Sequence, residues 1–229
     1  MLLRRALDAS SVGVRDIRRL DARWHALNHP FTLNDHVGPT RGPSVLVQKG
    51  ARPLVFAAPH AVHHSRFGVL KTNDANTGGL AIALAQHLDA SAIALRRGGH
   101  EHGDPNVDLD HPLKRKAAPL VVPGVIFADL HGMADRDHEV IIGLGSSPTP
   151  QATELAERFV AIGQANGIAA TIADDETGFN ARGPATMTSW AAARGASAMQ
   201  FEIARRLRSV KSPPERRAAL LHTFVTVFA

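Results

Sequence analysis

The sequence of 229 residues contains no cysteine and no tyrosine, and only 5% of its residues are aromatic. Without cysteine the chain has no disulfide bonds and no thiolate ligands, so any bound metal ion must be held by histidine, aspartate or glutamate. Such ligands are more typical of a catalytic site than of a structural one. The scarcity of aromatic residues also leaves few side chains on which nucleic-acid bases could stack.

Long apolar runs are missing too. Residues 1–8, Met-Leu-Leu-Arg-Arg-Ala-Leu-Asp, lack the continuous hydrophobic region that a signal peptide needs. We therefore expect a cytoplasmic protein that does not bind a membrane. The formal charge of +5 comes from basic residues that are scattered in small clusters without interleaved aromatics. This distribution predicts a solvated basic surface that attracts small anions, and no nucleic-acid partner.

Apolar runs of strand length alternate with segments of helical pattern along most of the chain. Strands are predicted at residues 44–49, 54–60, 92–95, 121–130, 139–145, 169–173 and 198–203. Helices are predicted at residues 78–88, 151–166, 187–194 and 213–225. The alternation indicates a single α/β domain over residues 43–229, with a mixed, mostly parallel sheet flanked by helices on both faces. Residues 1–42 are punctuated by Gly-Pro turns and are predicted to be a largely irregular extension with one short helix at residues 14–27.

Histidines end two of the apolar runs. His60 closes the run that begins at residue 54, and His131 follows the run that ends at residue 130. Because ligands bind at the carboxyl ends of strands in open α/β sheets, these two imidazoles are the best-placed metal ligands. Catalytic zinc commonly takes two histidines and a carboxylate, and Asp74, near the next helix, or His63 could supply the third ligand. The structural alternative is a pair of hydrogen-bonded histidines without a metal.

The last predicted strand carries an acid among apolar residues. Apolar side chains alternate there with Gln200 and Glu202, so strand geometry places these two polar side chains on one face. A buried carboxylate is costly unless it is paired or close to a metal, which makes Glu202 a candidate general base. A buried salt bridge to Arg182, Arg194 or Arg205 is the structural alternative.

The segment over residues 96–105 is polar and rich in glycine, and it is predicted to be a loop. A second metal site could be built there, but an exposed loop is the favoured interpretation because adjacent loop residues lack rigid support. The potential ligands of such a site are His100, Glu101, His102 and Asp104. The motifs G-x-S-x-G, G-x-x-x-x-G-K-[ST] and G-x-G-x-x-G do not follow any predicted strand, so serine hydrolysis and nucleotide binding have no support.

Five short motifs occur in a fixed order from residue 54 to the C-terminus. They are Pro59-His60-Ala61, Asp74-x-x-Thr77, Asp129-Leu-His131-Gly-Met133, Asn180-x-Arg182-Gly183 and Gln200-Phe-Glu202-Ile203. In this order they resemble the motifs of the N-formylglutamate amidohydrolases. The resemblance implies a fold similar to that of zinc carboxypeptidases and aspartoacylases, and one zinc ion per chain held by His60, His131 and, best, Asp74. It also implies that Glu202 is the base and that the loop with Arg182 binds a substrate carboxylate.

Two positions depart from this resemblance. Val62 stands where the family usually has glycine, and His111 stands where it has an arginine that can bind an acidic substrate. We therefore expect a side-chain preference that is broader than, or shifted from, a strict preference for glutamate.

Together these features predict a zinc-dependent hydrolase that cleaves the C–N amide bond of a small, anionic N-acyl amino acid. Arg66, Arg97 and Arg182 are the candidate residues for binding the substrate carboxylate or the developing oxyanion. A metallopeptidase that cleaves a peptide or γ-glutamyl bond is one alternative. The other is a non-catalytic relative that binds a partner through its basic surface.

Overall fold

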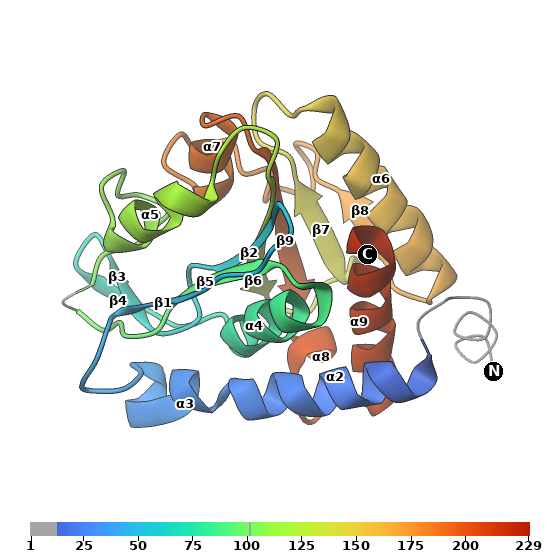
Figure 1. Cartoon of the computed structure of the whole chain (residues 1–229), viewed down its shortest axis with the longest axis horizontal. Coiled ribbons are helices and arrows are strands. Elements are labelled where there is room, and N and C mark those ends of the chain that lie inside the picture. Colours follow the sequence, from blue (N-terminus) through green and yellow to red (C-terminus); the bar gives the residue numbers. More distant parts are fainter. Residues whose placement is uncertain (1–12, 101) are drawn as a thin grey trace.

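A computed structural model of the chain describes residues 13–100 and 102–229 (Figure 1). The main sheet has seven strands in the order β1-β5-β2-β6-β9-β7-β8. Its strands are β1 (Val45–Gln48), β2 (Leu54–Ala58), β5 (Ser91–Leu95), β6 (Ile126–Met133), β7 (Val140–Gly143), β8 (Ala170–Ile172) and β9 (Ser197–Ala204). The block β5-β2-β6-β9 is parallel, whereas β1 is antiparallel to β5 and β7 is antiparallel to β9. The predicted mixed, mostly parallel sheet is therefore confirmed.

Helices and one small hairpin surround this sheet. The described helices are α2 (Val14–Leu27), α3 (His29–His36), α4 (Thr77–Leu88), α5 (Pro112–Ala117), α6 (Pro150–Ala165), α7 (Met187–Ala192), α8 (Arg205–Arg208) and α9 (Pro214–Phe228). A 3-10 turn (Ala118–Leu120) follows α5, and a separate hairpin consists of β3 (His64–Arg66) and β4 (Val69–Lys71).

The two faces of the central strands carry different kinds of side chain. On one face Phe56 of β2 and Phe201 of β9 contact Phe224 of α9, and α4 and α6 cover the same side (Figure 1). Strand alternation turns Asp129 and Glu202 toward the opposite face, against which α7 packs. A sheet that is buried on both sides is typical of parallel sheets covered by helices.

Local signals explain where two of the helices begin. The hydroxyl oxygen of Thr149 accepts the backbone N–H of Ala152 at 3.1 Å, and Pro150 occupies the first turn of α6. In α7 the hydroxyl of Thr186 accepts the N–H of Ser189 at 3.2 Å. The second cap fixes the end of the long loop that precedes α7.

The N-terminal segment is more regular than predicted. The helix predicted at residues 14–27 is present as α2, and α3 follows where irregular chain was expected, although residues 33–35 of α3 have non-helical backbone angles. Ile17, Leu20 and Trp24 of α2 are buried, and α2 packs on α4 and α9 (Figure 1). Their spacing of three and four residues places them on one helical face, which explains why this segment joins the core. Residues 1–12 lie outside the described part of the chain.

The strand that carries His131 is shifted relative to its predicted bounds. The sequence predicts a strand at residues 121–130, whereas β6 begins at Ile126 and ends at Met133. A turn that includes Gly124, with a φ of 84°, delays the start of the strand. His131 therefore lies within β6 instead of after it.

Two further elements were not predicted. The polar stretch at residues 65–73, predicted as a loop, forms most of the β3–β4 hairpin, with Phe67 and Gly68 in its turn at φ values of 53° and 77°. Such positive φ values at both turn residues match a type I′ hairpin turn. Helix α5 is short and begins at Pro112, where His111 caps it by accepting the N–H of Leu113 at 3.1 Å.

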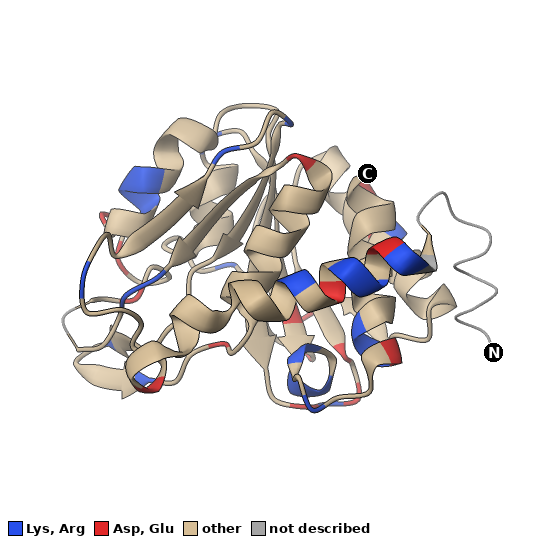
Figure 2. Ribbon diagram, turned by 60° about the horizontal axis from the view of Figure 1, so that its bottom comes forward, with Lys and Arg blue, Asp and Glu red and all other residues tan. Residues whose placement is uncertain are grey.

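Charged residues are spread over many elements. Lys and Arg occur on several helices and loops, and along α2 they are interleaved with Asp (Figure 2). This arrangement matches the scattered basic surface that the sequence predicts. Within residues 13–100 and 102–229, no helix is both long and apolar enough to cross a membrane.

Candidate metal centre

Four polar side chains meet near the carboxyl ends of neighbouring strands. His60 follows β2, and the register pairs His131 of β6 with Glu202 of β9. Asp74 lies shortly before α4, and its backbone N–H donates to the carbonyl of His60 at 2.7 Å. All four residues line one cavity of about 420 Å³.

His60, Asp74 and His131 present potential ligand atoms that lie close together. Oδ2 of Asp74 is 3.5 Å from Nδ1 of His60 and 3.2 Å from Nδ1 of His131. One ligand atom from each residue lies within 4.8 Å of the other two. Two imidazoles and a carboxylate are a common ligand set in hydrolytic zinc sites and leave a position for water. The donor set therefore fits a zinc ion.

In both imidazoles the Nε2 atom, which lies on the side of the ring away from Asp74, faces a buried carboxylate. Nε2 of His60 lies 2.8 Å from Oδ1 of Asp104, and Nε2 of His131 lies 3.3 Å from Oδ1 of Asp129. The second contact is a close approach and not a well-formed hydrogen bond, since that oxygen has no hydrogen-bond donor in the described chain. Oδ2 of Asp129 accepts from the hydroxyl of Thr188 at 3.1 Å. A carboxylate at Nε2 favours a proton on that nitrogen and leaves Nδ1 able to bind a metal.

A second group of potential ligands, His60, His64 and Asp104, lies beside the first. The rings of His60 and His64 stack with their centroids 4.2 Å apart. Asp104, however, already accepts hydrogen bonds from the guanidinium of Arg66 and, at 2.7 Å, from the N–H of Asn106. A guanidinium on this carboxylate repels a metal cation. The first group is therefore the better site for a cation.

Burial and hydrogen bonding shift several pKa values in this cluster. Burial alone would raise the pKa of Asp74, but hydrogen bonds with His131 and His60 hold it well below the ordinary aspartate value. Burial would lower the pKa of His60 and His131, yet contacts with neighbouring aspartates raise both. Burial raises the pKa of Glu202 to about 7, and His131 offsets only part of this effect. Glu202 is therefore a buried acid whose proton affinity lies near neutrality, which suits proton transfer.

Glu202 does not form the buried salt bridge that was the alternative to a catalytic role. Its Oε1 accepts a hydrogen bond from Nε2 of Gln200 at 3.0 Å. Over the residues that the structure describes, no ion pair joins Glu202 to Arg182, Arg194 or Arg205. The carboxylate therefore faces the cavity without a paired arginine.

Two of the three predicted substrate-binding arginines reach the cavity. Arg182 is exposed and lines it from the loop before α7, with Nη1 2.6 Å from Asp175. Arg66 of β3 lines it as well, with its Nε donating to a buried carboxylate. Arg97 is not a lining residue, and its guanidinium donates to a backbone carbonyl at 3.3 Å. Arg66 and Arg182 are thus two cations that a substrate can meet.

His63 lies apart from the ligand groups. Its Nδ1 accepts the backbone N–H of Asn73 at 2.9 Å, and its ring centroid is 5.7 Å from that of His36. Neither group of potential ligands found in the described chain includes it. Asp74 is the third residue that the structure brings to the two imidazoles.

The loop over residues 96–105 differs from its predicted form. Asp104 is fully buried, with 0% exposure, where an exposed loop was favoured. Its contacts with His60 join residues far apart in the chain, and no spacing in the sequence indicates them. Asn106 and Thr188, which contact this cluster, were not predicted either. Glu101 lies outside the described residues.

A buried arginine connects the segments that carry the site. Arg208 donates from Nε to the carbonyl of Ile203 at 2.8 Å and from Nη2 to that of Met133 at 3.2 Å. Its Nη1 donates to the carbonyl of Ala75, in the segment before α4. A Cβ atom at Gly132 would lie 2.3 Å from the guanidinium, so any other residue there would displace the end of the Arg208 side chain. One side chain thus ties the ends of β6 and β9 to the segment that carries the acidic ligand.

No protein-family model matches the sequence, and no curated protein matches it. Among solved structures the chain is similar to a bacteriophage poly-gamma-glutamate hydrolase, with 18% identity and a TM-score of 0.55 over 82% of this chain and 90% of that one. It is similar to N-formylglutamate amidohydrolase from Ralstonia eutropha, with 14% identity and a TM-score of 0.52 over 80% of this chain and 97% of that one. For a protein assigned as carboxypeptidase A from Shewanella denitrificans the identity is 15% and the TM-score 0.50, over 92% and 67% of the two chains. At these identities the likeness concerns the fold, and the predicted zinc-carboxypeptidase-like fold is confirmed.

Proposed function

We propose that this protein is a zinc-dependent hydrolase that cleaves the C–N amide bond of a small, anionic N-acyl amino acid. The observation that carries the proposal is the meeting of His60, Asp74 and His131 in one cavity with an unpaired, buried Glu202. A buried carboxylate without a cationic partner is unfavourable for stability, so its place beside potential metal ligands indicates a chemical role. The fold shared with a solved N-formylglutamate amidohydrolase supports the same class of reaction.

His60, His131 and Asp74 would hold one zinc ion per chain. When bound, zinc supplies a Lewis acid that polarises the scissile carbonyl and lowers the pKa of a water molecule. Asp104 and Asp129 would keep the two imidazoles in their orientation and protonation state, because each faces the Nε2 of one ring.

Glu202 is proposed as the general base and acid. Its carboxylate takes a proton from the attacking water and then delivers it to the nitrogen of the leaving amine. Burial raises the pKa of Glu202 above its ordinary value, which favours uptake of the proton, whereas a zinc ion held nearby would favour the ionised form that accepts it. Gln200 holds Oε1 at 3.0 Å, which leaves Oε2 for the proton transfers.

The cations of the cavity indicate that the substrate is anionic. Arg182 is exposed in a loop that also contributes Gly183, and a planar guanidinium can bind a carboxylate through two hydrogen bonds. A volume of about 420 Å³ suits a single acylated amino acid. His111, at the position where the resemblance implies an arginine, is buried and caps α5. We therefore propose a side-chain preference broader than glutamate alone.

The first test is the metal content of protein that is purified without added metal or an affinity tag. We expect about one zinc ion per chain, and its loss in His131→Ala, because the removal of one of three ligands removes much of the binding free energy. Asp74→Ala should also lose zinc, whereas His63→Ala should retain it and is the matched control. Full zinc occupancy in His131→Ala would overturn the proposed metal site.

The second test concerns substrate binding. Arg182→Ala should lower kcat/KM for anionic substrates by a factor equivalent to about 1.5–3 kcal/mol, the range for a hydrogen bond to a charged group. Zinc content should not change. Arg115→Ala removes an equally exposed arginine that pairs with Asp110 at 2.9 Å, and it should leave kcat/KM unchanged. An equal effect of both variants would contradict a specific role for Arg182.

A hydrolase of a peptide or γ-glutamyl bond is the second candidate. The observation that favours it is the likeness to a bacteriophage poly-gamma-glutamate hydrolase over 90% of that chain. A panel of N-formyl and N-acetyl amino acids, acidic and neutral, should be assayed beside γ-glutamyl and α-linked peptides. Cleavage of the acylated amino acids supports the first proposal, and cleavage of peptides alone supports the second.

A further inference from the structure

The main sheet has an open edge at β1. In the described chain β1 pairs only with β5, and it stands at one end of the strand order. The N–H of Arg96 donates to the carbonyl of Ser44 at 2.7 Å, so these two residues form a hydrogen-bonded pair. Such pairs alternate in an antiparallel ladder, so Leu46 also faces β5, whereas Val45 and Val47 direct their backbone groups away from it. These two valines form a short unpaired edge.

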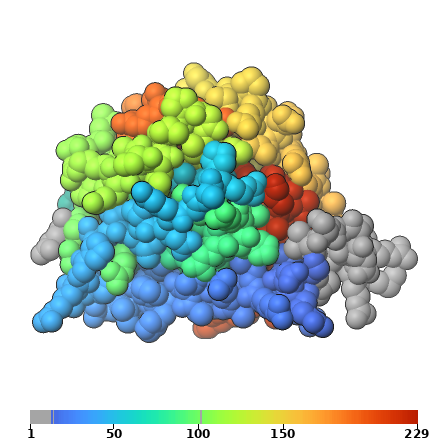
Figure 3. Space-filling model, in the orientation of Figure 1, coloured from blue at the N-terminus to red at the C-terminus, as the bar shows by residue number. Residues whose placement is uncertain are grey.

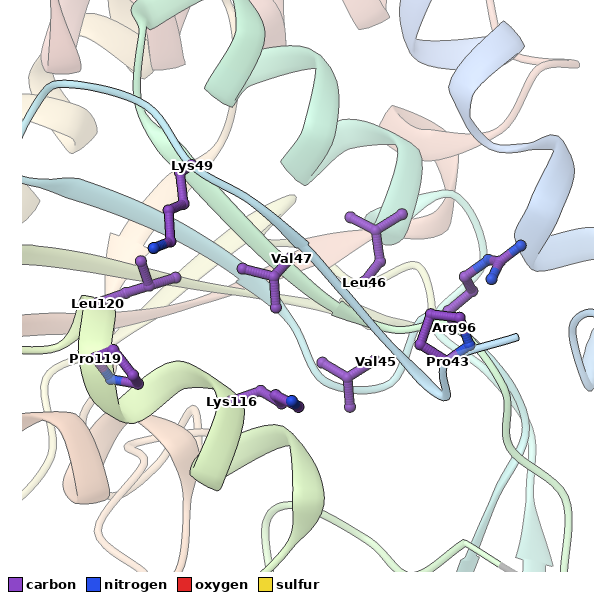
Figure 4. A pocket seen from close by; sticks show the side chains of 9 residues that line it. All are labelled: Pro43, Val45, Leu46, Val47, Lys49, Arg96, Lys116, Pro119 and Leu120. Carbon is purple, nitrogen blue, oxygen red and sulfur yellow. The ribbon is translucent and has the colours of Figure 1, made fainter. Parts of the chain in front are cut away.

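A hollow of about 550 Å³ lies beside this edge (Figure 4). Val45 and Val47 line it together with Pro119 and Leu120, whereas the side chain of Leu46 points to the other side of the strand (Figure 4). Figure 3 shows the segment that contains β1 beside the segment of α5 on one exposed face of the molecule. The hollow therefore combines an apolar floor with a free strand edge.

Two cations, Lys49 and Lys116, border the apolar floor, and the side chain of Arg96 is directed to the side of the strand to which Leu46 points (Figure 4). Lys49, Arg96 and Lys116 line the hollow, and the lining contains no aspartate or glutamate. None of the three cations forms an ion pair within residues 13–100 and 102–229. Such a surface is complementary to a ligand that has both carboxylates and apolar side chains.

We propose that the β1 edge binds an extended, acidic peptide segment of a partner protein as an added strand. The backbone groups of Val45 and Val47 supply hydrogen bonds, and alternate side chains of the peptide enter the hollow and give specificity. Acidic side chains on the same face of the peptide as its apolar residues meet Lys49 and Lys116. A second copy of this chain is a poorer occupant, because edge-to-edge pairing brings the same cations of both copies together. This surface is separate from the proposed catalytic cavity, so the inference does not depend on the proposed function.

The test uses the full chain and a synthetic peptide with blocked ends, Glu-Ser-Val-Ser-Val-Ser-Glu, in which the valines and glutamates share one face of the strand; binding is measured by fluorescence anisotropy. We expect saturable binding of one peptide per chain. A peptide with lysine in place of glutamate should bind at least about tenfold more weakly, because its charges match those of the hollow. A peptide with serine in place of valine should also bind more weakly, because it cannot fill the apolar floor.

Two variants separate the charges from the backbone edge. Lys49→Glu/Lys116→Glu should weaken binding of the acidic peptide by about tenfold or more. Val47→Pro removes an outward N–H without removing a hydrogen bond to β5, and it should weaken binding as well. Arg15→Glu/Arg18→Glu changes two exposed arginines of α2 and is the charge-matched control that should leave binding unchanged.

Several results would overturn the inference. They are an absence of binding at millimolar peptide, an equal loss of binding in the α2 control, and a dimerisation of the chain that the edge variants abolish. Thermal unfolding of each variant shows whether it is folded. If Val47→Pro is not folded, the charge reversal and the three peptides still decide the question. Zinc content should be the same in all folded variants.

Discussion

Glu139 and Glu202 are two buried glutamates beside neighbouring strands, and their surroundings are opposite. They are 6% and 7% exposed, respectively. Glu139, just before β7, accepts hydrogen bonds from Arg206 at 2.8 Å, from Arg216 at 2.5 and 2.6 Å, and from a backbone N–H at 3.1 Å. Glu202, on β9, accepts one from Gln200 at 3.0 Å. Two carboxylates with nearly the same exposed fraction thus differ in the charge of their hydrogen-bond partners.

The pKa values of the two carboxyls diverge for this reason. Burial raises the pKa of Glu202 to about 7. Burial would raise the pKa of Glu139 too, but hydrogen bonds from Arg216 and Arg206 outweigh it and lower that pKa below its ordinary value. Burial alone therefore does not reveal the role of an acid. A buried carboxylate surrounded by cations stabilises the fold, whereas one without them is available for chemistry.

The largest expected effect is that of Glu202→Gln on catalysis. Glutamine keeps the shape of the side chain but cannot accept and return a proton, so kcat should fall about 10²–10⁴-fold. Zinc content should be retained, because Glu202 is not one of the proposed ligands. Steady-state kinetics and metal analysis of the same sample check both points. Unchanged activity would place the reaction elsewhere, and loss of zinc would make Glu202 a ligand.

Asp129→Asn tests a third buried carboxylate, the one that faces Nε2 of His131. Asparagine removes the negative charge that supports the imidazole, so zinc affinity should fall about 10–100-fold. Competition with a chelator measures this affinity. Glu139→Gln removes another buried carboxylate, one that does not line the cavity, and is the control, with unchanged zinc affinity. Equal affinities in the wild type and Asp129→Asn would show that Asp129 does not support the ligand.

Glu139→Gln should instead lower the free energy of unfolding, by about 1–2 kcal/mol, because it removes hydrogen bonds between charged groups. The loss of stability is moderate because the side chains of Arg206 and Arg216 are 41% and 32% exposed, so water can hydrate them when the carboxylate is removed. Glu202→Gln should leave the free energy of unfolding unchanged or raise it, since it removes a buried carboxyl whose pKa burial raises and whose hydrogen-bond donor is the neutral amide of Gln200. Urea unfolding of both variants measures the contrast. A larger loss of stability in Glu202→Gln than in Glu139→Gln would contradict the comparison.

The smallest expected effect is a pH dependence of the Glu139 contribution. The folded-state pKa of Glu139 lies below its ordinary value of 4.5, so the folded state binds fewer protons than the unfolded state as that group titrates. Its stabilisation is therefore complete above pH 4.5 and is lost as the pH falls through the folded-state pKa. The stability difference between the wild type and Glu139→Gln should shrink over that acidic range. A difference that grows as the pH falls would reverse the assignment of Glu139 as a stabilising carboxylate.

Local patterns in the sequence account for the features that were predicted well. Alternation along β9 placed Gln200 and Glu202 on one face, and the register sets them opposite Asp129 and His131 of β6. The apolar runs predicted the strands of the parallel block, because strands buried on both faces have few polar residues. Periodicity and strand ends depend only on neighbouring residues, so one sequence is enough to detect them.

The features that were missed depend on contacts between distant segments. Asp104 is buried because it contacts His60 and Arg66, which precede it by about forty residues and which no local pattern links to it. Helix α3 was not predicted because the segment around it contains several Gly and Pro residues, which typically indicate turns. The spacing of Ile17, Leu20 and Trp24 was the available signal that the segment packs on the core.

Arg208 divides the wall of the catalytic cavity into segments that it holds by hydrogen bonds and a loop that it does not contact in this way. The ends of β6 and β9 and the segment before α4 share one guanidinium through their backbone carbonyls, so a change that displaces Arg208 removes hydrogen bonds from all three. The loop before α7, in contrast, contributes residues 179–183 to the cavity without a hydrogen bond to Arg208 among the described contacts. Diversification confined to that loop can therefore change which substrate is accepted while the residues proposed to hold the metal stay in place. The loop keeps one link to the proposed base, because Gln200 donates both to Glu202 and, at 3.5 Å, to the carbonyl of Phe179, so that carbonyl is the point at which a changed loop would reach the chemistry.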